Sequence, residues 1–247
     1  MHRDCNEVRP HSSLKGGTPK EYAEAAAGLL IPGATDLGGR VIIGLMSILN
    51  YGSLIDPVLR DLRRFAVEFS GVKSGDRVID VCCGTGAQVL EFARRGVAAT
   101  GLDISEAMLK IATRNKMKEG ASNVSFQLGD ASDLLFPDDY FDCAMVTFGL
   151  HDKEKAVRHR IVSEMVRTVK EGGNLILIDF QVPLPRNKWA LIAKVVEFSV
   201  GGSHYRGFRE YLESGGLEAI LKVYGLREVN RAYPLSGLVT AVKLSND

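Results

Sequence analysis

The sequence predicts an α/β fold in which a mostly parallel sheet is covered by helices on both faces. Strand-like apolar runs alternate with helix-like patterns from Asp76 to Phe180. A short glycine turn, "CCGTG", lies between the first such strand and the helix that follows it. Acidic residues stand at the ends of the next two strands. Strand–helix–strand units of this kind join neighbouring parallel strands, so the alternation predicts helices on both sides of one sheet.

The first part of the pattern is a helix from Leu54 to Ser70, because its apolar residues recur at helical spacing. These residues are Leu59, Leu62, Phe65, Ala66 and Phe69. The alternating part then predicts the following elements in chain order: a strand at 76–83, a helix at 87–96 closed by Gly96, a strand at 97–103, a helix at 105–120 with Ser105 as N-cap, strands at 123–130 and 141–149, a helix at 152–173 closed by Gly172 and Gly173, and a strand at 174–180.

The pattern changes after Phe180. Two prolines fall within 181–186, and two helical stretches follow, around 189–200 and 209–224. Two short strand candidates, "LREVNRA" and "GLVTAVKL", end the sequence. We expect them to form an antiparallel hairpin or meander at the edge of the sheet.

The composition points to a soluble protein that does not bind nucleic acid. Lys+Arg 31 against Asp+Glu 30 leaves a net charge of +1, whereas phosphate contacts need clustered positive charge. The apolar runs at 41–49 and 189–200 are shorter than the roughly 18 residues that span a bilayer. The first residues lack the apolar core of a secretory signal, and the four cysteines have no paired spacing. We therefore expect a cytoplasmic protein without stable membrane insertion; its oligomeric state stays open.

We expect four segments along the 247 residues. Residues 1–30 form an appended, flexible segment, 31–70 a helical cap, 71–182 the cofactor-binding core, and 183–247 cap helices and the C-terminal hairpin. Residues 6–22 resemble the C-terminal tail of integrase-type transposases, which suggests a relic of gene fusion. An ordinary flexible extension is the alternative.

The glycine turn predicts a nucleoside site. Gly84 permits the tight turn, and Gly86 lets a ligand approach the backbone at the helix N-terminus. Val89 replaces the third glycine of a dinucleotide fingerprint, which disfavours a pyrophosphate. Asp103 follows Gly84 by nineteen positions and suits the two hydroxyls of a ribose. Asp130, after the third strand, suits the exocyclic amine of an adenine.

Cys82 and Cys83 are expected to line the loop. In a strand, adjacent side chains point to opposite faces, a poor geometry for one metal ion. We therefore predict no metal or redox role for this pair.

Four stretches taken in order resemble class I S-adenosylmethionine-dependent methyltransferases: "VIDVCCGTG", "GLDISEAML", "LGDASDLLFPDDYFDCAMVTFGL" and "VKEGGNLILIDF". The resemblance is strongest to the C-methyltransferases of ubiquinone and menaquinone synthesis and runs from about Tyr51 to the C-terminus. It implies a Rossmann-like, seven-stranded sheet with a reversed last strand and a small helical cap. It also implies S-adenosylmethionine as cofactor and S-adenosylhomocysteine as product.

The resemblance implies which residues contact each part of the cofactor. It implies that the methionine end lies against Tyr51, Asp80, Cys82, Cys83, Gly84 and Gly86. It implies that Asp103 holds the ribose, with Ile104 and Met108 against the adenine. Asp130 and Ala131 are implied to contact the adenine edge, and Thr147 and Phe148 to flank the sulfonium.

The sequence predicts the identity of the methyl acceptor less specifically than the identity of the cofactor. His151 and Tyr205 are the candidates for a catalytic base, if the acceptor arrives protonated. A capping or partly exposed role is the alternative for His151, and a surface turn is the alternative for the glycine-flexed segment around His204 and Tyr205. We expect methyl transfer to a small organic acceptor, with a quinone-like or phenolic ring carbon favoured. N- or O-methylation, a nucleoside-binding module without catalysis, and a disfavoured NAD-dependent oxidoreductase remain alternatives.

Overall fold

The computed structural model describes residues 51–200 and 202–247. Seven strands form one sheet in the order β3-β2-β1-β4-β5-β7-β6. Their bounds are β1 (Arg77–Val81), β2 (Ala98–Asp103), β3 (Val124–Leu128), β4 (Phe141–Thr147), β5 (Val169–Phe180), β6 (Arg227–Ala232) and β7 (Val239–Ser245). Strands β1 to β5 are parallel, and β7 runs antiparallel to both of its neighbours, β5 and β6. The predicted sheet with a reversed last strand is confirmed.

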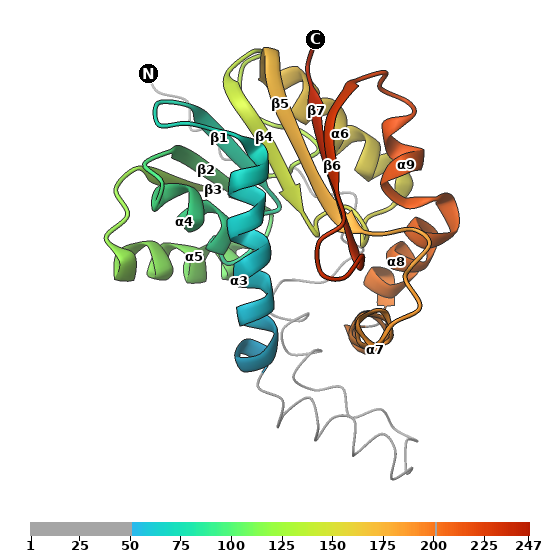
Figure 1. Ribbon diagram of the computed structural model, residues 1–247. Coiled ribbons are helices and arrows are strands. Elements are labelled where there is room, and N and C mark those ends of the chain that lie inside the picture. The colour runs from blue at the N-terminus through green and yellow to red at the C-terminus, as the bar shows by residue number, and fades with distance from the viewer. Residues whose placement is uncertain (1–50, 201) are drawn as a thin grey trace, which may run out of the picture. The chain divides into compact units, whose positions relative to one another are not determined.

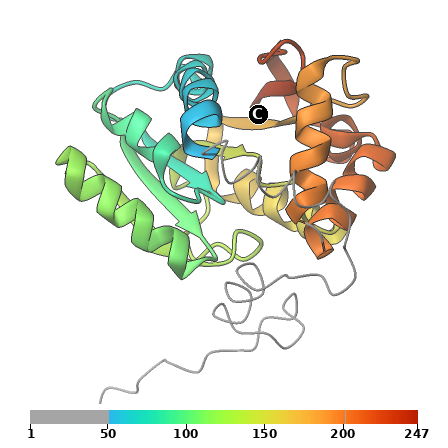
Figure 2. The ribbon, with the colours of Figure 1, turned by 90° about the horizontal axis from the view of Figure 1, so that it is seen from below.

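Helices lie on both faces of this sheet. Their bounds are α3 (Tyr51–Ser70), α4 (Ala87–Ala93), α5 (Glu106–Glu119), α6 (Lys155–Thr168), α7 (Lys188–Val200), α8 (Gly202–Ser214) and α9 (Gly216–Leu221). Viewed from below, α3 and α6 lie on opposite faces of the sheet (Figure 2). Helices α7 and α8 lie beyond the end of the sheet at which β4 and β5 finish (Figure 1).

The sequence explains the bounds of α5 well. The Ser105 hydroxyl accepts a hydrogen bond from the Met108 N–H, as an N-cap residue does. Gly120 ends the helix with a φ of 63°, a left-handed conformation that glycine adopts without a steric penalty. The predicted helix and its Ser105 N-cap are confirmed.

The predicted helix at 152–173 is wrong at its C-terminal end. Helix α6 stops at Thr168, and Gly172 and Gly173 lie inside β5, which begins at Val169. Gly172 has a φ of 73°, and the pairing of β5 with β4 shifts register at this point. The glycines therefore form an irregularity in a strand instead of closing a helix.

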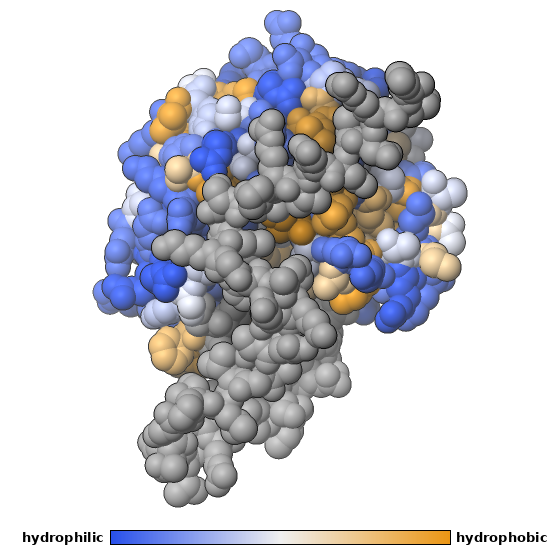
Figure 3. Space-filling model, turned by 180° about the vertical axis from the view of Figure 1, so that it is seen from behind, coloured by the Kyte–Doolittle hydropathy of each residue, from blue (hydrophilic) through white to orange (hydrophobic). Residues whose placement is uncertain are grey.

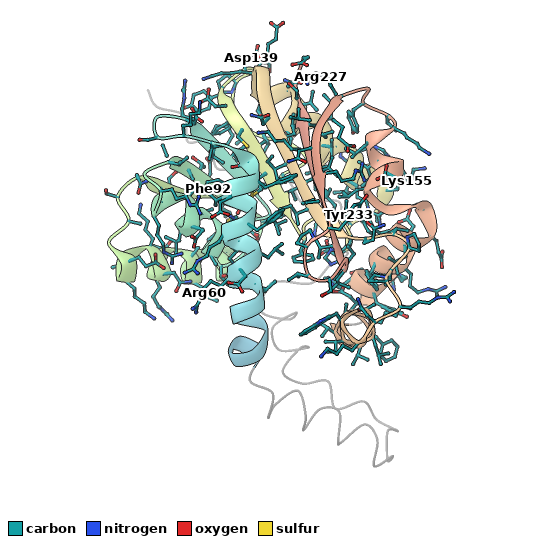
Figure 4. All side chains as sticks on the ribbon, viewed as in Figure 1. Arg60, Phe92, Asp139, Lys155, Arg227 and Tyr233 are labelled. Atoms are coloured by element: carbon teal, nitrogen blue, oxygen red, sulfur yellow. The ribbon has the colours of Figure 1, made fainter. Side chains whose placement is uncertain are left out.

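The core lies between the sheet and its helices. Strand β4 and the second half of β5, Leu175–Phe180, bury almost every side chain, as expected for parallel strands covered on both faces. Phe92 of α4 is fully buried and points into this core (Figure 4). On the outside, hydrophilic residues surround the margin of the face seen from behind, and apolar residues gather nearer its middle (Figure 3). Among the described residues, no helix has the length and apolar character to cross a membrane.

A buried arginine joins α6 to the C-terminal helices. Arg158 is only 1% exposed. Its Nε donates to the Leu150 carbonyl at 3.0 Å, and its Nη2 donates to the Gly207 carbonyl of α8 at 2.7 Å. Glu210 stands 3.6 Å from the same guanidinium and supplies its countercharge.

Replacing Arg158 with leucine should destabilise the fold. Arg158→Leu leaves two buried carbonyls without donors, so we expect the free energy of unfolding to fall by about 3 kcal/mol. The control is Arg160→Leu, an exposed position in the same helix. Urea denaturation of both variants measures the difference, and equal stabilities would contradict this role of Arg158.

Candidate functional site

The glycine turn follows β1 at the end of the sheet where the parallel strands finish. Strand β1 ends at Val81, so the predicted strand at 76–83 extends two residues too far at its C-terminal end. Cys82 has a φ of 58°, Gly84 of 53° and Gly86 of 73°. The cysteines therefore lie in the loop and not in a strand, and our strand-based argument about their side chains is wrong.

Asp103 ties this turn to the end of β2. One carboxylate oxygen accepts a hydrogen bond from the Gly84 N–H at 2.7 Å, and the other accepts one from the Ser105 N–H at 2.8 Å. Asp103 is half-buried. The loop after β1 and the acid after β2 thus form one rigid unit at adjacent strand ends.

The two glycines of the turn face different surroundings. A Cβ atom on Gly86 would lie 2.4 Å from the Phe126 ring, so only glycine fits beneath β3. A Cβ atom on Gly84 would meet no atom of residues 51–200 and 202–247 within 4 Å. Among these residues nothing therefore covers the Gly84 backbone, and a ligand can approach it closely.

The surroundings of Asp103 fit a nucleoside. Ile104 and Met108 are 46% and 42% exposed, although both are large apolar side chains. Across the strand ends, Asp130 accepts the Ser132 N–H with one oxygen, and Ala131 is buried. These residues offer apolar and acidic contacts of the kind that a purine and a ribose use.

Two polar groups deeper in the site are incompletely matched by the described residues. The Thr147 hydroxyl at the end of β4 is buried and has no hydrogen-bond partner there. Asp80 of β1 is 2% exposed, and burial, helped by the nearby charge of Asp103, raises its pKa to about 8. A cationic, hydrogen-bonding ligand would suit both groups. Tyr51 begins α3, and its side chain lies outside the described residues.

A second group of polar side chains surrounds His151, just after β4. His151 is 4% exposed, so the partly exposed alternative is wrong. Its Nδ1 lies 2.8 Å from Asp179 Oδ1, and its Nε2 lies 3.6 Å from Glu197 Oε2 on α7. The same Glu197 oxygen lies 2.6 Å from His204 Nε2 on α8, and His204 Nδ1 lies 3.3 Å from Asp152.

These contacts shift the pKa of both histidines upward. Burial alone would lower the pKa of His151, but Asp179 and Glu197 raise it to about 10. For His204, the hydrogen bonds to Asp152 and Glu197 raise the pKa to about 9. Without another cation between them, both imidazoles therefore hold a proton at neutral pH.

The sequence prediction for residues around 204 is wrong in one respect. His204 and Tyr205 lie within α8 and not in a glycine-flexed segment or a surface turn. The Tyr205 ring packs edge-on against Phe198 of α7, with the ring centroids 5.3 Å apart. His151 and Tyr205 are thus near the same helix pair, but it is His204 that His151 approaches.

Comparison with known proteins identifies the family. The model of the ubiE/COQ5 methyltransferase family matches residues 57–196, more than half of the chain. The chain belongs to the UbiE/COQ5 methyltransferase family. A ubiquinone/menaquinone biosynthesis C-methyltransferase of Pseudomonas aeruginosa (strain LESB58) is 41% identical over 129 residues, and that of Pseudomonas putida (strain GB-1) is 40% identical. The matched region spans about half the length of these relatives, 48% of each, and 49% of this chain.

A solved structure supports the fold. A SAM-dependent methyltransferase from Aquifex aeolicus superposes with a TM-score of 0.57 at 18% identity, over 75% of this chain and 89% of that one. At this identity the likeness concerns the fold alone. It agrees with the seven-stranded sheet described above.

Two site residues of this UbiE/COQ5 family member were not predicted from the sequence. Asp179 ends an apolar strand, "NLILID", and Glu197 is the one acidic residue in the apolar stretch "WALIAKVVEFSV". Burying a charged side chain costs free energy unless hydrogen-bond donors or opposite charges surround it. An acidic residue inside an apolar segment is therefore the sequence signal that marks both positions. Which partners they meet depends on the folding of distant segments.

The thiols of Cys82 and Cys83 in the glycine turn have low reactivity. Burial raises the pKa of Cys82 to about 12 and that of Cys83 further upward. Cys143 of β4 is buried, and its pKa is also raised to about 12. Because the thiolate is the reactive form, these cysteines are poor nucleophiles at neutral pH.

Thiol labelling tests this conclusion. In a Cys5→Ser variant, a thiol reagent at pH 8 should label Cys82, Cys83 and Cys143 at least 100-fold more slowly than a free thiol, because only about one thiol in 10,000 is ionised at a pKa of 12. The same protein unfolded in guanidinium serves as control, and in it all three thiols should react at the rate of a free thiol. Rapid labelling of the folded protein would contradict the assigned protonation states.

Proposed function

We propose that this chain is an S-adenosylmethionine-dependent methyltransferase that acts on a small organic acceptor. The observation that carries the proposal is the hydrogen bond from Gly84 to Asp103. It joins the glycine turn to the acid at the next strand end, where open α/β sheets bind nucleosides. Membership of the UbiE/COQ5 family supports the same reaction.

The described residues suggest how the cofactor would be held. Asp103 would accept hydrogen bonds from the ribose hydroxyls, with Ile104 and Met108 along one side of the adenine. Asp130 and Ala131 would contact the adenine edge. The methionine end would lie over Gly84 and Gly86, with its ammonium near Asp80 and its sulfonium near Thr147.

The bound cofactor supplies an activated methyl group, so this chain's task is to align the acceptor and to exclude water. Phe148 stands at the end of β4 with a φ of 55°, a conformation that is uncommon for a non-glycine residue. Its ring packs against Phe180, with the centroids 5.2 Å apart. This aromatic wall, next to the Thr147 hydroxyl, suits the space between cofactor and acceptor.

The acceptor is proposed to be apolar, with a quinone-like or phenolic ring carbon as the favoured site of methylation. Helix α7 supports this, because Leu191, Ile192, Val195 and Phe198 are exposed on it. Such a surface suits a substrate with an apolar tail. N- or O-methylation of another small metabolite is the second candidate.

A general base remains a prediction. The surroundings of His151 weigh against it, because both ring nitrogens already face carboxylates and the ring is buried. Tyr205 is more accessible, although its ring packs against α7. A phenol or quinol that ionises in solution would need neither residue.

Substitution of Asp103 tests the cofactor site. Asp103→Asn should weaken S-adenosylmethionine binding by about 100-fold, because charge-assisted hydrogen bonds contribute about 1.5–3 kcal/mol each. Asp133→Asn, an exposed acid near the same strand ends, is the matched control. Isothermal titration calorimetry measures both, and thermal unfolding checks that each variant is folded. Unchanged affinity in Asp103→Asn would refute the ribose assignment.

The pH dependence of cofactor affinity tests the role of Asp80. If the ionised carboxylate holds the ammonium, affinity should rise about tenfold per pH unit between pH 6 and 7, since the free site has a pKa of about 8. The ligand's ammonium stays protonated in this range. The slope should vanish in Asp80→Asn. A wild-type affinity that is independent of pH would exclude this contact.

Titration with three ligands separates the candidate classes. S-adenosylmethionine and S-adenosylhomocysteine should bind, and NAD should not. Binding without transfer to any quinone-like, phenolic or amine acceptor would favour a nucleoside-binding module. Binding of NAD alone would overturn the proposal.

A further inference from the structure

We propose that His151, Glu197 and His204 form a binding site for one divalent transition-metal ion, of which Zn²⁺ is the probe. Their nearest ligand atoms all lie within 4.8 Å of one another. The three residues come from the loop after β4, from α7 and from α8. None of them is among the residues assigned to the cofactor.

The geometry suits a single ion. The two imidazole Nε2 atoms lie 3.6 Å and 2.6 Å from the same Glu197 oxygen. Ligands bound at about 2.0–2.2 Å around a tetrahedral ion stand roughly 3.3–3.6 Å apart. One of the two separations from Glu197 reaches this range and the other is shorter, and all three ligand atoms lie within 4.8 Å of one another, so modest side-chain shifts would bring them around one ion.

The outer contacts have the form that metal-bound histidines use. In each histidine the other ring nitrogen, Nδ1, faces a carboxylate: Asp179 at 2.8 Å for His151 and Asp152 at 3.3 Å for His204. Such carboxylate partners fix the tautomer that presents Nε2 to a metal and orient the ring. Both histidines are thus held with Nε2 toward the same point.

These partners are themselves fixed. Asp179 also accepts the backbone N–H groups of Leu150, His151 and Phe180. Lys153 binds both oxygens of Asp152 at 2.7 Å. Aromatic rings surround His151, with Phe180 at 4.9 Å and Phe208 at 6.0 Å between centroids. The site is therefore preorganised and largely dry on the His151 side.

The donor set indicates the class of ion. Two imidazoles and one carboxylate suit Zn²⁺, Fe²⁺ and similar ions, and do not suit Mg²⁺ or Ca²⁺, which prefer oxygen ligands. Three protein ligands leave a coordination position open, as in catalytic zinc sites. If the proposed function is correct, that position suits an oxygen of the acceptor.

A network of charged hydrogen bonds is the alternative. In it, both histidines are protonated and balance the carboxylates, and no ion binds. The two cases differ in one measurable property, which is stoichiometric metal binding that depends on these three side chains.

The experiment uses the full chain after treatment with a chelator. Zn²⁺ is titrated by calorimetry, and Co²⁺ is added separately to record its visible absorption spectrum. We expect one equivalent to bind, with a spectrum of nitrogen and oxygen ligands and no thiolate charge-transfer band. His204→Ala and Glu197→Gln should each abolish this equivalent. Asp152→Asn should weaken it by about 10- to 100-fold.

His159→Ala is the matched control, because this histidine of α6 contacts Tyr224 and not the cluster, so the substitution should leave binding intact. It shows whether the loss of a histidine outside the cluster lowers metal binding. Thermal unfolding checks each variant, and His204→Ala is preferred over His151→Ala because His204 does not contact Asp179. Absence of stoichiometric binding, or binding that survives both ligand substitutions, would overturn the proposal.

The metal-site proposal and the proposed function can be refuted independently of each other. Calorimetry with S-adenosylmethionine reports on the Asp103 region and does not require the ion. Cofactor binding without metal binding would refute the metal site alone. Metal binding without cofactor binding would refute the methyltransferase proposal and leave the metal site standing.

Discussion

The hydrogen bonds of the Asp179 carboxylate hold together the end of the molecule that carries the candidate site. It lies at the end of β5, is completely buried, and accepts three backbone N–H groups and the ring of His151. A buried carboxylate is tolerated only when donors surround it, so its position dictates the path of the loop after β4. That loop in turn presents Arg158 with the Leu150 carbonyl that helps to anchor α6 and α8.

The glycine turn after β1 and the loop that carries His151 meet where the order of the sheet reverses. Strands β1 and β4 are neighbours in space, and the connections run outward from them in opposite directions. Open α/β sheets bind ligands at this switch point because the loops diverge there. The approach is close: a Cβ atom on Gly149 would lie 2.8 Å from Cys82. Small residues at both positions allow the two loops to pack together, which explains the cysteine in the turn better than any reactivity of its thiol.

Local patterns predicted the sheet and most of its helices, because the spacing of apolar residues along a short stretch indicates a strand or a helix. The nucleoside site that the same patterns indicate stays a prediction. Ser105 caps a helix that begins beside it, and Asp103 reaches a glycine on the neighbouring strand end. The C-terminal end of α6 was mispredicted because the residue that contacts this region, Asn246, lies far along the sequence. Asn246 accepts the Gly172 N–H with its backbone carbonyl and donates through its side chain to Val169. The histidine cluster was missed for the same reason, as its members stand 46 and 53 positions from His151.

The short loop after β4 connects the proposed cofactor site to the cluster of His151, Glu197 and His204. Thr147 and Phe148 border the proposed sulfonium position, and His151 follows within four residues. Asp179 fixes the backbone of Leu150 and His151, which closely follow Phe148 along the chain. Glu197 and His204 attach α7 and α8 to the same loop. The helices that expose the apolar surface and the strand that borders the proposed cofactor site are therefore connected through one buried polar cluster. Any ligand that orders this cluster would also fix the aromatic wall against which the proposed acceptor would be aligned.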